Sequence, residues 1–279
     1  MRKNPEIKMV ALDLDGTALT PDRHFSPRTK DAFAKAMAQG VHVVIATGRT
    51  LQSLPEEIYH IPGLEYGITS NGARILHLHD RRVIFESLLT PDAVRAVIAV
   101  AQERGIRAEG FTQGHAYIDQ KEFDGVQNGT ITTRDRAYVM ATRNPVPDIF
   151  AFLEDHCHSI ENISLNYDSD AQKGETEAVL AQIPGITLTS SFPLNNEVGG
   201  ADTSKANSLR ILCQQLGLTE NQLMAVGDSH NDLAMIRLAA VGVAMGNAEE
   251  AVKAEADHVT LSNAEDGVAL AMERFVLGK

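Results

Sequence analysis

The sequence predicts an α/β protein built on a parallel sheet, because short apolar runs alternate along the chain with helical patterns. Residues 8–14 and 41–47 are brief runs rich in β-branched side chains, as buried parallel strands are. Between them, residues 26–39 carry apolar side chains at helical spacing. Strand, helix and strand in this order form a βαβ unit.

The helix predicted over residues 26–39 has a start and a stop in the sequence. Ser26 suits the N-cap, Pro27 suits the first helical position, and Gly40 suits the position after the helix end. Two more buried strands are predicted over 223–226 and 241–245, with a helix over 232–238 between them. The same architecture therefore opens and closes the chain.

The middle of the chain has a different pattern. Helices are predicted over 91–104, 146–157 and 174–182, and strands over 116–118, 164–167 and 187–190, with many Gly, Asn and Thr residues between them. This pattern predicts an α+β cap domain inserted between the two halves of the parallel-sheet domain. We therefore divide the chain into a first core part (1–85), a cap (86–194) and a second core part (195–279).

Composition excludes several classes of function. The net charge of −12 argues against a nucleic-acid or anionic-membrane partner, because phosphate backbones are bound by clustered Lys and Arg. No apolar run is long enough to span a membrane, and the N-terminal residues lack the apolar core of a signal peptide. Two distant cysteines without CxxC spacing fit a reducing compartment, so we expect a cytoplasmic protein. The sequence does not indicate an oligomeric state.

Polar motifs follow three of the predicted parallel strands. They are DLDGT (13–17), ATGR (46–49) and GDSHND (227–232), and a fourth polar motif, TSK, occupies 203–205. In open α/β sheets, ligands bind at the carboxyl ends of the strands. Gly16 allows the chain to turn at once, so Asp13 and Asp15 are both expected to face this edge.

The residue types in these motifs suit a phosphoryl group and a metal ion. Two close carboxylates repel each other unless a cation or proton lies between them, and Asp228 and Asp232 add further acids. Mg²⁺ is usually bound by one or two carboxylates with water and substrate phosphate. Thr47 and Gly48 offer a hydroxyl and backbone amides to an anion, and Lys205 offers a positive charge. We interpret the first acid pair as one group that attacks phosphorus and one that moves a proton.

The combined motifs closely resemble those of the haloacid dehalogenase-like (HAD) hydrolases, specifically the Cof-type phosphatases with a large C2-type cap (class IIB). The resemblance rests on DLDGT, ATGR, SNGA (70–73), Lys205, GDSHND, GVAMGNA (242–248) and ADHVT (256–260). It covers both core halves, whereas the cap is matched only by size and placement. It implies a Rossmann-like core, dependence on Mg²⁺ and an aspartyl-phosphate intermediate.

The resemblance also implies catalytic and phosphate-binding roles. By that resemblance Asp13 is the nucleophile and Asp15 the general acid/base. Thr47 and Lys205 hold the transferring phosphoryl group, and Asn231 lies next to the phosphate.

A metal site follows from the same resemblance. It implies that Asp228 ligates Mg²⁺ together with Asp13 and the backbone carbonyl of Asp15, and that Asp232 supports the metal through its waters. The sequence departs from the family pattern at Ala18, where many relatives have Leu; this position is away from the chemistry.

Each assignment has a structural alternative. Asp15 and Gly16 could form an ordinary turn. Asp228, Asp232 and Thr47 could be helix N-caps, and Lys205 could be a solvated side chain. All these alternatives would have to hold together to replace the functional interpretation, so we favour the functional one. His230 and His115 are further candidates for substrate contact, each with a surface position as its alternative.

The sequence therefore predicts a Mg²⁺-dependent phosphomonoester hydrolase acting on a small phosphorylated metabolite, such as a sugar phosphate. A phosphotransferase or phosphomutase on the same core is an alternative, because both classes use the DxD motif. A non-catalytic sensor of a phosphorylated metabolite is another, although it would not need Asp15. An ion-pumping ATPase is excluded by the lack of a membrane span, and a P-loop nucleotidase by the lack of a GxxxxG loop before Lys205. Sugar phosphates, flavin-related phosphates and pyridoxal phosphate all remain open as substrates.

Overall fold

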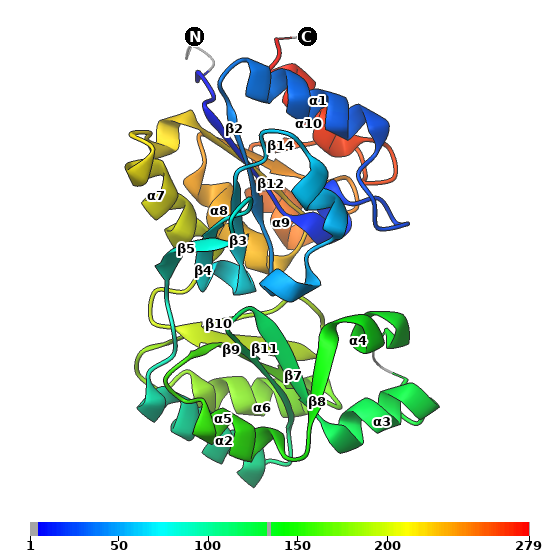
Figure 1. Ribbon diagram of the computed structural model, residues 1–279, viewed down its shortest axis with the longest axis vertical. Coiled ribbons are helices and arrows are strands. Elements are labelled where there is room, and N and C mark those ends of the chain that lie inside the picture. Colours follow the sequence, from blue (N-terminus) through cyan, green and yellow to red (C-terminus); the bar gives the residue numbers. More distant parts are fainter. Residues whose placement is uncertain (1–4, 133–134, 279) are drawn as a thin grey trace. The chain divides into compact units, whose positions relative to one another are not determined.

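The computed structural model describes residues 5–132 and 135–278, and the chain forms two compact units (Figure 1). The core unit consists of Met1–Gly48, Pro55–Phe85 and Ser204–Lys279. The cap unit consists of Arg49–Leu54 and Glu86–Thr203. The mixed α/β class and the parallel-sheet core are as predicted.

An eight-stranded sheet organises the core unit, in the order β14-β13-β12-β1-β2-β3-β4-β5. The strands from β14 to β3 are parallel, and β4 runs antiparallel to β3. Their bounds are β1 (Met9–Leu12), β2 (His42–Ala46), β3 (Tyr66–Thr69), β4 (Arg74–His77), β5 (Arg82–Glu86), β12 (Leu223–Gly227), β13 (Val241–Ala244) and β14 (His258–Val259). The strands β3 to β5 extend the sheet beyond the predicted ones.

Helices cover both faces of the core sheet, because its strands are apolar on both sides. Met9 and Ala11 of β1 pack with Leu209 on one face, which α7 and α8 cover. Side chains alternate along a strand, so Val10 and Leu12 point to the other face, where α1 and α10 lie together (Figure 1). The helix bounds are α1 (Pro27–Ala38), α7 (Lys205–Gln215), α8 (Leu233–Leu238), α9 (Glu250–Glu255) and α10 (Gly267–Phe275).

The predicted ends of α1 are confirmed. The side chain of Ser26 accepts a hydrogen bond from the backbone N–H of Thr29, and Pro27 occupies the first helical position. Gly40 follows the helix with a φ of 77°, a left-handed conformation that glycine adopts without strain.

The cap unit contains a six-stranded sheet in the order β10-β11-β9-β6-β7-β8, in which only β7 and β8 pair in parallel. Helices α2, α5 and α6 pack on one face around an apolar cluster, while α3 and α4 pack beside β7 and β8. The bounds are β6 (Arg107–Thr112), β7 (His115–Asp119), β8 (Arg143–Val146), β9 (Ile160–Asn166), β10 (Ile186–Thr189), β11 (Asn195–Gly200), α2 (Pro91–Glu103), α3 (Gln120–Asn128), α4 (Arg136–Thr142), α5 (Ile149–Asp155) and α6 (Asp170–Leu180).

Two boundaries differ from the predicted domain division. The second core part begins at Ser204 and not at residue 195, because β11 pairs with β9 and β10 and so belongs to the cap sheet. The segment Arg49–Leu54 also belongs to the cap unit, where the backbone N–H of Gln52 donates to the carbonyl of Gly114 at 2.9 Å. The unit boundary therefore cuts the ATGR motif after Gly48.

Two helices in the cap begin elsewhere than predicted. The helix expected over 146–157 begins at Ile149, because Asp148 accepts hydrogen bonds from the backbone N–H groups of Phe150 and Ala151, and Val146 ends a strand. The helix expected over 174–182 begins earlier, because Ser169 caps it. In both cases the capping side chain decides the start.

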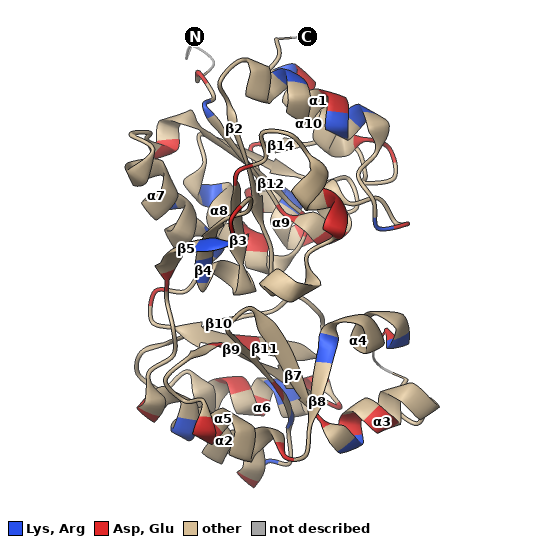
Figure 2. Cartoon of the chain, in the orientation of Figure 1, with Lys and Arg blue, Asp and Glu red and all other residues tan. Residues whose placement is uncertain are grey.

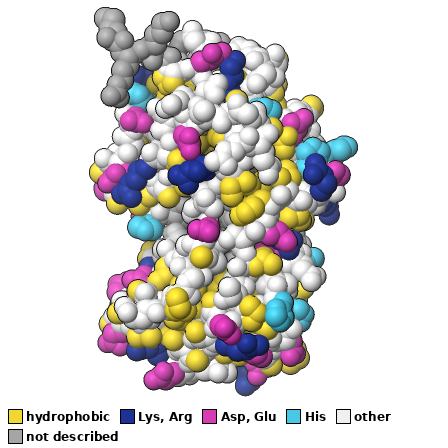
Figure 3. Space-filling model, turned by 90° about the vertical axis from the view of Figure 1, so that its left-hand side faces the viewer, with side chains coloured by type: hydrophobic (Ala, Val, Ile, Leu, Met, Phe, Trp, Pro, Cys, Tyr) yellow, Lys and Arg dark blue, Asp and Glu magenta, His cyan; other side chains and the backbone are white. Residues whose placement is uncertain are grey.

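Charges of both signs are distributed over both units (Figure 2). The face in Figure 3 likewise carries Lys, Arg, Asp and Glu side chains in scattered positions, without a continuous basic surface. No helix in the described part of the chain is long and apolar enough to cross a membrane. Cys157 and Cys213 are both buried and form no disulfide.

Candidate active site

The candidate active site lies at the carboxyl ends of neighbouring core strands. Strand β1 pairs with β2 on one side and with β12 on the other. The segments that follow these strands begin with Asp13, Thr47 and Asp228, so parallel pairing brings them to the same sheet edge. Lys205 reaches this edge as the first residue of α7.

A buried ammonium group joins two of the predicted acids. The Nζ atom of Lys205 lies 2.7 Å from a carboxylate oxygen of Asp13 and 2.7 Å from one of Asp232. The exposed fractions are 1% for Lys205, 6% for Asp13 and 0% for Asp232. The solvated-lysine alternative is therefore wrong.

Charge attraction keeps Lys205 protonated in this environment. Burial by itself would lower the pKa of Lys205, but the attraction and hydrogen bonds of Asp13 and Asp232 raise that pKa above its ordinary value. An ionised ammonium at this position favours ionised carboxylates beside it.

Burial is the main cause that raises the pKa values of two of these acids. Burial, followed by the charges of Asp232, Asp228 and Asp15, raises the pKa of Asp13 well above its ordinary value, although Lys205 opposes this. Burial and the charge of Asp232 raise the pKa of Asp228 to about 6. An added cation would relieve both groups.

The donor set fits a hard divalent cation. Asp13, Asp228 and Asp232 each offer a carboxylate oxygen, and these oxygens all lie within 4.8 Å of one another. Carboxylate oxygens are the ligands that Mg²⁺ and Ca²⁺ prefer. Within residues 5–132 and 135–278, no other group of three His, Cys, Asp or Glu side chains has this spacing.

The turn after β1 is shaped by its contact with Asp228. Gly16 has a φ of 79°, and a Cβ atom there would lie 2.3 Å from an Asp228 carboxylate oxygen. The hydroxyl of Thr17 donates to Asp228 at 2.8 Å, and the amide of Asn247 donates to the Gly16 carbonyl at 2.8 Å. Only glycine therefore combines this conformation with this approach.

Asp232 also organises the loop after β12. Its second carboxylate oxygen accepts hydrogen bonds from the backbone N–H groups of Asp228 and Ser229, at 3.0 and 3.1 Å. Asp232 is the N3 partner of Ser229 in a capping box, and at the start of α8 its side chain makes no capping hydrogen bond, so the N-cap alternative is wrong for Asp232. The same side chain nevertheless binds Lys205, and its structural and electrostatic roles coexist.

The turns after β2 and β3 meet through an asparagine that the site predictions did not include. Asn71 has a φ of 56°, and its backbone N–H donates to the Thr47 carbonyl at 3.1 Å. Its side-chain oxygen accepts from the amide of Asn231 at 3.0 Å and lies 3.1 Å from where a Cβ on Gly48 would stand. Its only signal in the sequence is the SNGA motif. Thr47 is buried and caps no helix.

The remaining candidates have exposed side chains. Asp15 follows Asp13 in the tight turn and is exposed, which suits a group that exchanges protons with water. His230 is exposed at the start of a short helical turn. His115 lies in the cap unit, where its Nδ1 atom is hydrogen-bonded to Gln52 at 2.8 Å.

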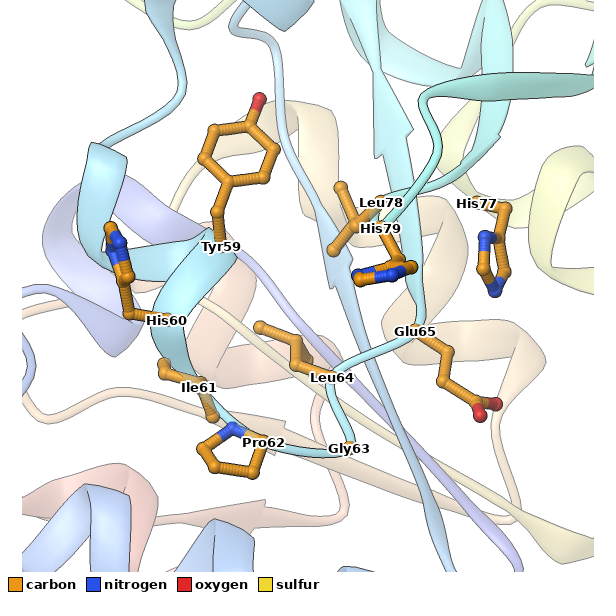
Figure 4. A pocket seen from close by; sticks show the side chains of 10 residues that line it. All are labelled: Tyr59, His60, Ile61, Pro62, Gly63, Leu64, Glu65, His77, Leu78 and His79. Carbon is orange, nitrogen blue, oxygen red and sulfur yellow. The ribbon is translucent and has the colours of Figure 1, made fainter.

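A separate cavity of about 460 Å³ lies in the core unit, between residues 59–65 and 77–79 (Figure 4). Its three histidines, His60, His77 and His79, are set apart around it and do not converge on one point. The Nδ1 atom of His77 lies 2.8 Å from Asp80, and that of His60 lies 3.0 Å from the Glu56 carbonyl. None of the predicted site residues lines this cavity.

The model of the haloacid dehalogenase-like hydrolase family matches residues 10–272. The chain belongs to this family. The match includes the acidic cluster, Lys205 and the whole cap unit, and it agrees with the HAD resemblance in the sequence.

Relatives of this HAD-family chain include phosphatases. The 5-amino-6-(5-phospho-D-ribitylamino)uracil phosphatase YcsE of Bacillus subtilis is 31% identical over 276 residues, which are 99% of this chain and 98% of that protein. The structure of the subclass IIB sugar phosphatase BT4131 matches with a TM-score of 0.81 and 25% identity, covering 96% of this chain and 98% of that one. BT1666 from Bacteroides thetaiotaomicron matches with a TM-score of 0.82 and 28% identity, covering 99% and 97%. The protein is thus a HAD-type phosphatase that acts on small phosphorylated molecules.

Proposed function

We propose that the protein is a Mg²⁺-dependent phosphomonoester hydrolase whose substrate is a small phosphorylated metabolite, a sugar phosphate or a similar ester, and whose reaction passes through an aspartyl-phosphate on Asp13. The observation that carries this proposal is the buried ion pair of Lys205 with Asp13, at 2.7 Å, beside the acids Asp228 and Asp232. A buried, paired carboxylate next to a cation site is suited to attack phosphorus.

In the first step, a carboxylate oxygen of Asp13 forms a bond to phosphorus as the bond to the ester oxygen breaks. Asp15 donates a proton to that leaving oxygen, and the alcohol departs. In the second step, water attacks phosphorus, Asp15 takes the proton of the water, and the bond to Asp13 breaks. Free phosphate and the original carboxylate result.

The other site residues hold the charge of the phosphoryl group. Lys205 supplies an ammonium, Thr47 a hydroxyl, and Gly48 and Asn231 supply N–H groups. Asp13, Asp228 and the backbone carbonyl of Asp15 would hold Mg²⁺, with Asp232 supporting its waters. When bound, this ion neutralises charge on the phosphoryl oxygens.

A small substrate is favoured over a macromolecule. The net charge of −12 repels polyanions such as nucleic acids at long range. Two relatives, YcsE and YwtE of Bacillus subtilis, are named 5-amino-6-(5-phospho-D-ribitylamino)uracil phosphatases, and this ester therefore belongs in any substrate panel beside sugar phosphates.

A phosphate-release assay tests the proposal. The purified protein with Mg²⁺ should release free phosphate from at least one small phosphomonoester without a bisphosphate activator. Transfer of the phosphoryl group to a second sugar, without free phosphate, would instead identify a phosphotransferase or mutase. Binding without either reaction would identify a sensor and contradict the proposed role of Asp15.

A further inference from the structure

The SNGA motif (residues 70–73) forms the turn between β3 and β4, at the sheet edge where the candidate active site lies. Its backbone is unusual, because Ser70, Asn71 and Gly72 follow one another with φ angles of 49°, 56° and 103°. Residues other than glycine rarely adopt such angles, and asparagine adopts them more readily than most. A rare backbone conformation of this kind persists only where surrounding contacts hold it.

Gly72 packs against the beginning of α7. The hydroxyl of Ser208 donates a hydrogen bond to the Gly72 carbonyl at 2.7 Å. A Cβ atom on Gly72 would lie 2.2 Å from the carbonyl oxygen of Ser204 and 2.9 Å from the backbone nitrogen of Lys205. Because no side chain fits there, the turn lies directly against the backbone that carries Lys205.

Asn71 connects the same turn to two other segments of the candidate site. Its backbone N–H donates to the Thr47 carbonyl at 3.1 Å. The Nδ2 atom of Asn231 donates to the Oδ1 atom of Asn71 at 3.0 Å. Asn71 is 3% exposed, so solvent has little access to this acceptor. The SNGA turn therefore contacts three segments that carry residues predicted to bind phosphate.

The hydrogen bond from Asn231 fixes the orientation of its own amide group. An asparagine amide has two N–H donors and one carbonyl acceptor, and rotation about its last torsion angle exchanges their positions. The acceptor oxygen of Asn71 holds the nitrogen of Asn231 in place, and the second N–H donor then serves a phosphoryl oxygen. Without that acceptor, the amide is free to rotate and to present its carbonyl oxygen, whose partial negative charge repels phosphate.

We propose that Asn71 is a positioning residue for phosphate binding, which orients the Asn231 amide so that an N–H group faces the phosphoryl group. This inference rests on the proposed function, because Asn231 is a phosphate-binding residue only by that proposal. Asn71 acts through Asn231 and is not itself a catalytic residue.

A double-mutant cycle tests the coupling between Asn71 and Asn231. Asn71→Gly removes the acceptor oxygen but keeps a residue that adopts the left-handed conformation, and Asn231→Ala removes the amide. We expect each single variant to weaken the binding of inorganic phosphate about tenfold, measured by calorimetric titration in buffer with Mg²⁺. The double variant should bind phosphate within about twofold of Asn231→Ala alone.

A conservative variant separates positioning from support of the fold. Asn71→Asp keeps an acceptor oxygen, and aspartate also adopts the left-handed conformation. Its negative charge weakens phosphate binding by itself, so the informative quantity is the further effect of Asn231→Ala. This effect should be about tenfold beside Asn71→Asp and less than about twofold beside Asn71→Gly. A residue that only supports the fold would not restore this dependence.

Arg81 provides a matched control in the same unit. It also has a left-handed conformation, with a φ of 57°, and it lies in the turn at the other end of β4. Arg81→Gly makes the same change of backbone freedom at an exposed position, so it should keep the wild-type affinity for phosphate. Thermal melting of every variant, followed by circular dichroism, measures any loss of stability separately.

The outcomes separate this inference from the proposed function. If Asn71→Gly leaves the phosphate affinity unchanged, or if its effect multiplies with that of Asn231→Ala, the positioning role is wrong, while hydrolysis of a phosphomonoester still supports the phosphatase. If the coupling is found but no phosphomonoester is hydrolysed, the positioning role stands and the proposed reaction is wrong. A wild-type protein that neither binds phosphate nor releases it from an ester contradicts both.

Discussion

The core and cap units bury charged side chains in different ways. In the core unit, Lys205, Asp13 and Asp232 meet in short segments at strand and helix ends, where acids outnumber the base. In the cap unit, Glu109 and Arg143 form a buried pair of balanced charge. Excess negative charge marks a place that requires a cation, whereas a balanced pair is satisfied without one. The comparison supports our proposal that the chemistry takes place at the acidic cluster of the core unit.

Substitution of one buried carboxylate in each unit should show the largest difference between core and cap, measured as the change in kcat. Asp13→Asn removes the nucleophile, so we expect kcat to fall by about 10⁴-fold or more, with no phosphoenzyme trapped by acid quench. Glu161→Gln in the cap keeps an oxygen for the Gly114 N–H and should retain the wild-type kcat. Similar losses in the two variants, with both proteins folded by circular dichroism, would contradict the division of roles.

Removal of divalent metal should affect the core alone. After dialysis against EDTA we expect turnover to fall by about 10³-fold or more, and Mg²⁺ should restore it better than Ca²⁺, whose coordination shell is larger and looser. Hydrogen exchange should show protection by Mg²⁺ in residues 13–17 and 227–232 and not in the cap sheet. Full activity in metal-free buffer would exclude the cation site.

Asp15→Asn should produce a defect that depends on the leaving group. With a sugar phosphate we expect a loss of about 10²- to 10⁴-fold, because the leaving oxygen needs a proton. With p-nitrophenyl phosphate, the burst of nitrophenol should be much less reduced, since that leaving group needs no proton. Asp22→Asn, an exposed acid outside the motif, is the control. Equal losses of activity with both esters would show that Asp15 acts only as a metal-site or turn residue.

The smallest expected effect is a pH dependence of the metal-free core. Burial and the charge of Asp232 raise the pKa of Asp228 to about 6 from its ordinary value of 3.8, so the folded state favours its protonated form. The free energy of unfolding should therefore decrease as the pH rises from about 4 to about 6, and Mg²⁺ affinity should increase over the same range. Urea titrations with EDTA, and calorimetric titrations with Mg²⁺, measure the two trends. Asp228→Asn should reduce the dependence of the free energy of unfolding on pH. An unchanged dependence would show that Asp228 is not responsible for it.

Much of the core could be predicted because its signals are local. The strand β1, the helix α1 with Ser26 at its cap, and the motifs after β1, β2 and β12 depend on neighbouring residues in the chain. Parallel strands carry such motifs to one edge by geometry alone, so the close approach of Asp13 and Asp228 is consistent with the predicted constellation. The roles of the individual site residues remain predictions.

Other features required contacts between distant residues. Strand β11 could join either sheet by its pattern, and only its pairing with β9 and β10 assigns it to the cap. Arg107, Asn166 and Asn195 pair in register across β6, β9 and β11, and no sequence motif predicts this pairing, because the three strands lie far apart in the sequence.

The sequence by itself determined the fold class, the family and the polar edge of the core sheet. Periodicity, helix capping and short motifs depend on residues that are close together in the chain, so they can be recognised without a structure. Tertiary structure decided the unit boundaries, the burial of Lys205 between two acids and the link from Asn71 to Asn231. The physical reason is that strand pairing, desolvation and charge coupling depend on which distant segments pack together, and no local pattern specifies that choice.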